Sequence, residues 1–130
     1  MKRITVVGGG TMGVGIAYVS AQAGGDVTIV EPSDRRADGL RQDIAAATAS
    51  AVKRGKLTHD AARALDARIL RVAALADVRT AQDFIIESVP EDFGLKCRIL
   101  AEASEHCPHL LATNTSAISI DRLATAVARP

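Results

Sequence analysis

Apolar positions along the chain follow two alternating patterns. Short apolar runs, each bounded by Gly, Asp, Pro or Asn, alternate with longer stretches in which apolar residues recur every three or four positions. Short continuous apolar runs are typical of strands that are covered on both faces of a parallel sheet. Five such strands are predicted, at Ile4–Val7, Val27–Val30, Arg71–Ala74, Phe84–Ser88 and Leu110–Thr113.

The longer stretches predict helices between these strands. Ser33 and Thr58 are typical N-cap residues, and Gly55 between them is typical of a helix end. Helices are expected from Thr11, from Ser33 to Lys53, from Thr58 with Ile69 on its apolar face, after Pro90, and after Ser119 with Val127 on its apolar face. The alternation predicts an α/β fold with a doubly wound, Rossmann-type and mostly parallel sheet. The second and third predicted helices, on either side of Gly55, are expected to form an inserted helical hairpin.

Composition indicates one domain over residues 1–130, with 48% hydrophobic and 24% charged residues. Sixteen basic and fifteen acidic residues occur without a block of like charge, and aromatic residues make up 2%. This pattern predicts no nucleic-acid partner, because nucleic-acid binding needs a basic surface or aromatic side chains for stacking. It also predicts no membrane partner, because crossing a membrane needs a long apolar run. A small-molecule partner is expected instead, and no metal site is predicted.

The two cysteines indicate a reducing compartment. Cys97 and Cys107 are ten positions apart on an expected helix, a separation of roughly 15 Å at 1.5 Å per residue. A disulfide requires Cα atoms within about 7 Å, so none is expected between them. With no leader-like segment before the first strand, cytoplasmic localisation is predicted.

A glycine loop follows the first predicted strand. Gly8-Gly9-Gly10-Thr11-Met12-Gly13 matches the dinucleotide-binding pattern G-x-G-x-x-G. In such a loop, Gly8 permits the tight turn, Gly10 lets a pyrophosphate approach the backbone, and Gly13 allows close packing of helix on strand. The amides near Thr11 and Met12 then face the anion at the positive end of the helix dipole. A glycine turn without a ligand is the alternative.

The acid at the end of the second predicted strand indicates which dinucleotide is bound. Glu31 follows Gly8 by 23 positions, where a carboxylate accepts hydrogen bonds from the adenosine ribose hydroxyls and repels a 2′-phosphate. NAD is therefore the predicted cofactor. Arg35 and Arg36 leave NADP open as an alternative, although a solvated first turn of the second helix is the expected place for both.

Two further polar stretches follow strands at the same edge of the predicted sheet. Several acids follow the fourth strand within Phe84–Asp92, and Asn114, Thr115 and Ser116 follow the fifth. Ligands of open α/β sheets collect at this edge. The three polar residues are equally consistent with turn and capping roles. Lys96, on a charged helix face, is expected to be solvated.

Taken together, these motifs resemble the NAD-binding domain of the L-3-hydroxyacyl-CoA dehydrogenase family. The resemblance covers the whole chain, and several separate motifs in the right order are more specific than the glycine loop alone. They are Val6–Gly13 with Gly15–Ala17 and Ala21–Gly24, Gly55–Thr58, Ile86–Asp92 with Leu95–Lys96, and Asn114–Ser116 with Ser119–Ile120.

The resemblance implies roles for individual residues. Gly8, Gly10, Met12 and Gly13 would form the pyrophosphate loop, and Glu31 would bind the ribose, where Asp is the commoner residue. Glu91 and Lys96 would contact the nicotinamide half of the cofactor. Ser116 would donate a hydrogen bond to the 3-oxygen of an acyl-CoA substrate. The hairpin region around Lys53, Arg54 and Lys56 would meet the CoA phosphates, although ordinary solvated charges fit it equally well.

The resemblance also implies what residues 1–130 lack. Relatives continue into a Gly-x-His-Phe segment that carries the catalytic histidine, then into a helical substrate and dimerisation domain. His59, His106 and His109 match none of those positions and are expected on the surface or in loops. We therefore expect the NAD-binding part of a homodimeric enzyme that oxidises L-3-hydroxyacyl-CoA to 3-ketoacyl-CoA, with residues 1–130 alone inactive. The alternatives are a relative acting on a free hydroxy acid or carnitine, and an NAD-binding module without turnover.

Overall fold

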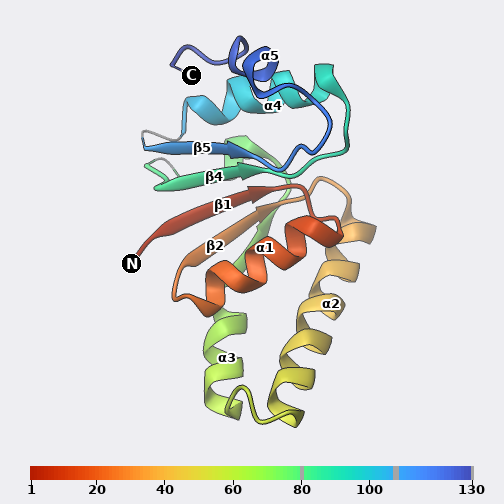
Figure 1. The fold of residues 1–130 in the computed structure, drawn as a ribbon. Helices are drawn as coiled ribbons and strands as arrows, with labels where there is room; N and C mark the ends of the chain where they lie inside the picture. The colour runs from red at the N-terminus through yellow and green to blue at the C-terminus, as the bar shows by residue number, and fades with distance from the viewer. Residues whose placement is uncertain (80, 107–108, 130) are drawn as a thin grey trace.

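The computed structural model describes residues 1–79, 81–106 and 109–129 and contains one parallel sheet (Figure 1). The strand order is β3-β2-β1-β4-β5, and every neighbouring pair is parallel. The strands are β1 (Arg3–Val7), β2 (Asp26–Val30), β3 (Ile69–Val72), β4 (Phe84–Glu87) and β5 (Leu110–Thr113). This order places β1 at the centre, where the direction of the crossovers reverses. The predicted doubly wound fold is confirmed.

Helices cover both faces of this sheet. They are α1 (Thr11–Gln22), α2 (Asp34–Lys53), α3 (His59–Ala67), the short 3-10 helix η1 (Leu75–Asp77), α4 (Phe93–Ser104) and α5 (Ile120–Ala124). Val6 is fully buried among side chains of α1, α2 and α3, whereas its neighbour Val7 packs with Ala103 of α4. Successive strand residues point to opposite faces, so the apolar run of β1 supplies both halves of the core.

The predicted helical hairpin is formed by α2 and α3, which extend together away from the sheet (Figure 1). Both predicted N-caps are confirmed: the Ser33 side chain accepts a hydrogen bond from the Arg36 amide, and Thr58 accepts one from the Ala61 amide. Gly55 lies between the helices with φ +69°, a conformation that favours glycine. Local side-chain signals therefore determine where this hairpin begins and turns.

Several predicted boundaries are wrong. Strands β1 and β2 each begin one residue earlier than predicted, and β4 ends at Glu87 instead of Ser88. Ile69 begins β3 instead of extending the third helix, and the strand ends at Val72 rather than Ala74. Ile69 follows Leu65 by four positions, so it fits helical spacing, but pairing with Val27 of β2 places it in the sheet. Helix α5 ends at Ala124, which leaves Val127 outside it. The short helix η1 was not predicted.

Two other expectations concern cysteines and membranes. Cys97 is a free thiol, and Cys107 lies outside the described residues, so the expectation of no disulfide between them is not tested. Within the described ranges, no helix has both the length and the apolar character that crossing a membrane requires.

Candidate functional site

A cavity of about 680 Å³ lies at the carboxyl ends of β1 and β4, the point at which the strand order reverses. Ligands of open α/β sheets bind at such points. Most of the predicted site residues line it: Gly8, Gly10, Thr11, Met12, Glu31, Glu91 and Ser116, together with Asn114 and Arg36. Gly13 and Lys96 do not line the cavity and lie behind its wall.

Close packing explains two of the loop glycines. Gly8 has φ +114°, and a Cβ there would lie 2.4 Å from the Ser88 carbonyl oxygen. A Cβ at Gly13 would lie 1.9 Å from the Gly8 carbonyl oxygen. Neither neighbour can give way easily, because both are backbone atoms. The predicted tight turn at Gly8 is therefore confirmed, and Gly13 lets α1 pack closely on the backbone that directly follows β1.

Gly10 has a different explanation. Its φ is −72°, which any residue adopts, and a Cβ built on it would meet nothing within 4 Å. Nothing in the described part of the chain requires glycine at this position. Because Gly10 lines the cavity, the open space beside it fits a group that must approach the backbone closely, as a pyrophosphate does.

The N-terminus of α1 is also suited to an anion. Gly10, its N-cap, offers no side-chain hydrogen bond, and no acidic residue lies in the first turn. The other α-helices in the described part of the chain are capped by side chains, namely Ser33, Thr58, Asp92 and Ser119. The first amides of α1 therefore remain available to a bound phosphate group, with the positive end of the helix dipole behind them.

Glu31 is held at the cavity wall by backbone amides. Its Oε1 accepts a hydrogen bond from the Gly9 amide (3.1 Å), and its Oε2 accepts one from the Ser33 amide (2.8 Å). Each carboxylate oxygen has a second lone pair for another donor. The side chain is thus fixed in place and can still accept hydrogen bonds from ribose hydroxyls.

Arg36 is only partly solvated: its side chain is 36% exposed, but it is held by two partners instead of extending freely into water. Its Nε donates to the Gly9 carbonyl (2.6 Å), and its guanidinium pairs with Asp43 (2.7 Å). The first turn of α2 lies close enough to the glycine loop for this side chain to reach the Gly9 backbone. Arg35 is exposed, as expected.

Lys96 is buried, contrary to expectation. Its side chain is 1% exposed, and Nζ lies 2.6 Å from Glu87 Oε1, 2.9 Å from the Val89 carbonyl and 3.2 Å from Glu91 Oε1. The physical reason is the buried carboxylate of Glu87 on β4, whose charge Lys96 neutralises. Sequence analysis missed Glu87 as a site residue; the available signal was an acid that ends an apolar strand nine positions before a lysine.

Glu91 connects this buried pair to the cavity. Its Oε2 accepts hydrogen bonds from Thr115 Oγ1 (2.9 Å) and from the Ala117 amide (3.3 Å). Partial desolvation acts to raise the pKa of Glu91, but the hydrogen bond from Thr115 and the charge of Lys96 outweigh it and lower the pKa. Glu91 is therefore a carboxylate at neutral pH.

Beside Glu91, the residues after β5 also reach the cavity. Ser116 is exposed and lines it, and the Asn114 side-chain amide donates to Ser88 Oγ (3.3 Å). Thr115 instead has a turn role, because its hydroxyl accepts from the Ile118 amide. His59, His106 and His109 lie elsewhere and do not line this cavity; His59 and His109 are exposed, and His106 is half-buried at the end of α4.

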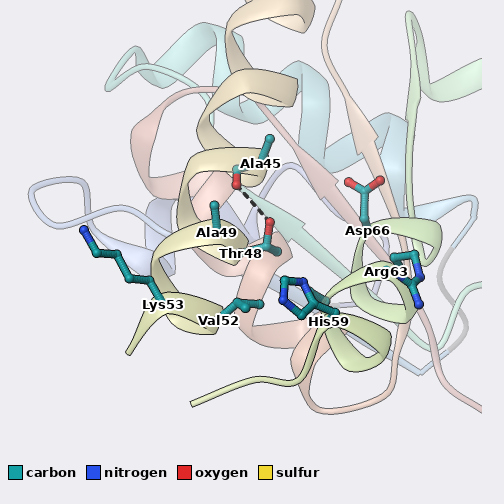
Figure 2. Close-up of a pocket in the computed structure, with 9 residues that line it drawn as sticks. Ala45, Thr48, Ala49, Val52, Lys53, His59, Arg63 and Asp66 are labelled. Atoms are coloured by element: carbon teal, nitrogen blue, oxygen red, sulfur yellow. Dashed lines mark hydrogen bonds between the residues drawn. The ribbon is translucent and has the colours of Figure 1, made fainter. Parts of the chain in front are cut away.

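A second cavity of about 700 Å³ lies between α2 and α3 (Figure 2). Ala45, Ala49 and Val52 of α2 give it an apolar side, and the Thr48 hydroxyl is turned back to the Ala45 carbonyl (2.9 Å). Lys53 and His59 line it where α2 ends and α3 begins, and Arg63 and Asp66 line it from α3. This groove therefore combines an apolar side with charged groups of both signs.

The fold and the first cavity define a class of protein: a dinucleotide-binding α/β domain. Residues 3–130 match the family model described as "3-hydroxyacyl-CoA dehydrogenase, NAD binding domain". The chain belongs to this family, and its cofactor is NAD.

Individual relatives agree with this assignment. The chain is 36% identical to 3-hydroxybutyryl-CoA dehydrogenase of Mycobacterium tuberculosis, over 100% of this chain and 46% of that protein. It is 35% identical to 3-hydroxyadipyl-CoA dehydrogenase of Escherichia coli K12, over 100% of this chain and 28% of that protein. The crystal structure of M. tuberculosis FadB2 superposes with a TM-score of 0.93 at 35% identity, covering 100% of this chain and 46% of that one. The chain thus spans less than half the length of these relatives.

Proposed function

We propose that this chain is the cofactor-binding part of an enzyme that transfers hydride between NAD and C3 of an L-3-hydroxyacyl-CoA. One observation carries the proposal: a single cavity contains the glycine loop, Glu31, Glu91 and Ser116. Relatives named as dehydrogenases of 3-hydroxybutyryl-CoA and 3-hydroxyadipyl-CoA support the substrate class.

Each residue at the cavity has a proposed task. The amides of α1 bind the pyrophosphate, and Glu31 accepts hydrogen bonds from the ribose hydroxyls. Glu91 contacts the nicotinamide half of the cofactor, and Lys96 holds Glu91 from behind with an Nζ–Oε1 distance of 3.2 Å. When bound, NAD supplies the hydride acceptor. Ser116 donates a hydrogen bond to the substrate 3-oxygen and thereby orients the reacting carbon.

We assign the groove between α2 and α3 to the CoA part of the substrate. Its apolar side suits the adenine or pantetheine portion, and Lys53, at the last position of α2, suits a phosphate. Arg54 and Lys56 lie in the connection that follows α2 and add positive charge near this end.

We propose that the general base is supplied from outside residues 1–130, because no histidine lines the cavity. Ser116 can orient the substrate oxygen, but a neutral serine without a neighbouring base does not take up its proton. General-base help contributes about 10²–10⁴-fold to such reactions. Assembly into a homodimer through the additional segment and location in the cytoplasm are parts of the same proposal.

The test compares two lengths of protein. The 130-residue chain should bind NADH in calorimetric titration yet show no acetoacetyl-CoA reduction, whereas a protein extended through a helical domain should be active. In the extended protein, Ser116→Ala should lower kcat much more than it weakens NADH binding, because this hydrogen bond acts on the reacting oxygen. Ser104→Ala, at the far end of α4, is the matched control.

Three outcomes would contradict the proposal. Turnover by the 130-residue chain alone would refute an external base and direct attention to His106 and His109. Faster turnover of free acetoacetate or dehydrocarnitine than of the CoA ester would favour the related dehydrogenases. NADH binding without turnover of any of these substrates by the extended protein would favour a binding module.

A further inference from the structure

Glu87, the last residue of β4, is a fully buried carboxylate with three hydrogen-bond donors. Its Oε1 accepts from Lys96 Nζ (2.6 Å) and from the Val89 amide (2.7 Å), and its Oε2 accepts from Thr113 Oγ1 (2.5 Å). The side chain is 0% exposed. Three donors on two oxygens satisfy an ionised carboxylate. Glu87 therefore connects β4, α4 and the end of β5.

These contacts continue into a closed ring. Lys96 Nζ pairs with Glu91 Oε1 (3.2 Å), and Glu91 Oε2 accepts from Thr115 Oγ1 (2.9 Å). The Thr115 amide then donates to Thr113 Oγ1 (3.2 Å), whose hydroxyl returns to Glu87. We call these five residues the Glu87 ring. It joins the loop after β4, which carries Glu91, to the loop after β5, in which Thr115 directly precedes Ser116.

Stability alone is a weak reason for a buried ion pair. Desolvation of two charges offsets most of their attraction, and an apolar pair of similar volume is often at least as stable. A fully satisfied polar network does, however, fix one arrangement of the groups that it joins.

We propose that Glu87 is a positioning residue that, through its ring, sets the separation between the two loops on either side of the nicotinamide. The inference rests on the proposed function, since it requires the nicotinamide to lie between Glu91 and Ser116. It assigns Glu87 and Thr113 a role in cofactor binding although neither lines the cavity.

The experiment measures two ligands on the 130-residue chain by calorimetry. NADH carries the nicotinamide, whereas ADP-ribose lacks it and needs only the glycine loop and Glu31. Thr113→Val removes the bridging hydroxyl at nearly constant volume, whereas Thr113→Ser keeps the hydroxyl and removes only the methyl group. Glu87→Gln removes the carboxylate charge and replaces one acceptor oxygen of the ring by an NH2 donor, and Glu102→Gln, at an exposed position of α4, is the charge-matched control.

We expect Thr113→Val and Glu87→Gln each to weaken NADH binding about ten-fold, the effect of one charge-assisted contact, with ADP-ribose binding changed less than about two-fold. Thr113→Ser and Glu102→Gln should bind both ligands as the unmodified chain does. The Glu87→Gln/Thr113→Val double variant should lose no more NADH affinity than one single variant, because both break the same ring.

Equal losses of NADH and ADP-ribose affinity in either variant would show a purely structural role and overturn the proposal. Unchanged NADH affinity in Thr113→Val would also overturn it. If Glu87→Gln does not fold, the Thr113 pair decides the question alone. An unmodified chain that binds neither ligand would instead refute the proposed function, so the two failures are distinguishable.

Discussion

The glycine loop permits a matched experiment, because the same methyl group added at two positions should affect different properties. At Gly13 it should lower the stability of the fold, and at Gly10 it should lower the affinity for NADH. At Gly13 the new Cβ would lie 1.9 Å from the Gly8 carbonyl oxygen, roughly 1.6 Å inside the separation of about 3.5 Å at which heavy atoms attract. Helix α1 and the loop would have to move apart. We expect Gly13→Ala to lower the free energy of unfolding by about 2–3 kcal/mol, the upper range for overpacked sites.

At Gly10 the same methyl would meet no atom within 4 Å, and φ is −72°. Only the helix cap changes, which costs less than about 1 kcal/mol. The methyl would occupy space where we place the pyrophosphate. NADH affinity should therefore fall at least about ten-fold in Gly10→Ala, a loss of ~1.4 kcal/mol, and Gly10→Val should abolish binding.

The assay pairs urea unfolding, followed by far-UV circular dichroism, with calorimetric NADH titration of each variant. Gly13→Ala should unfold at lower urea, and both Gly10 variants should unfold close to the unmodified chain. NADH affinity of Gly10→Val within a few-fold of the unmodified value would refute the loop as a pyrophosphate site. A Gly13→Ala midpoint equal to that of the unmodified chain would refute the packing argument.

Three further predictions concern charged groups. The unmodified chain should bind NADH more tightly than NADPH, and Glu31→Ala should narrow that difference; tighter NADPH binding before mutation would contradict the ribose assignment. Asp43→Asn should release Arg36, which pairs with Asp43 at 2.7 Å, and raise NADPH affinity a few-fold in titration. The lowered pKa of Glu91 means that its carboxylate stabilises the fold above the ordinary value of 4.5 and that this contribution is lost as the pH falls through the lower folded value. The urea midpoints of Glu91→Gln and the unmodified chain should thus differ at pH 7 and converge as the pH is lowered through the folded pKa of Glu91, whereas Glu102→Gln should show no such convergence.

Local signals predicted much of the fold. Ser33 and Thr58 are predicted to cap helices, and each side chain accepts a backbone hydrogen bond there. In each cap the side-chain oxygen and the backbone amide that donates to it are three positions apart, so the cap can be predicted from a short stretch of sequence. The order of strand, glycine loop, helix and acid likewise predicted the cavity wall from Gly8 to Glu31.

Long-range pairing set the limit of prediction. The sequence predicts Lys96 on the surface, and its burial follows only from the position of Glu87 on a neighbouring strand. The sequence predicts a solvated Arg36, because the Gly9 carbonyl to which it donates lies 27 positions away. Ile69 satisfies helical spacing, and only its pairing with Val27 assigns it to a strand.

The central position of β1 bears on how the chain folds during synthesis. The core cluster beneath α1, α2 and α3 has its buried members between Val6 and Leu65, so this face of the sheet can be covered before β4 is made. The opposite face must wait, because Ile4 pairs with Phe84, eighty positions later, and Ala103 of α4 covers Val7. Loop-closure entropy must be overcome before that distant pairing contributes stability. In a nascent chain that ends near β3, helices can therefore cover one face of the sheet, while the other, apolar face remains exposed to solvent.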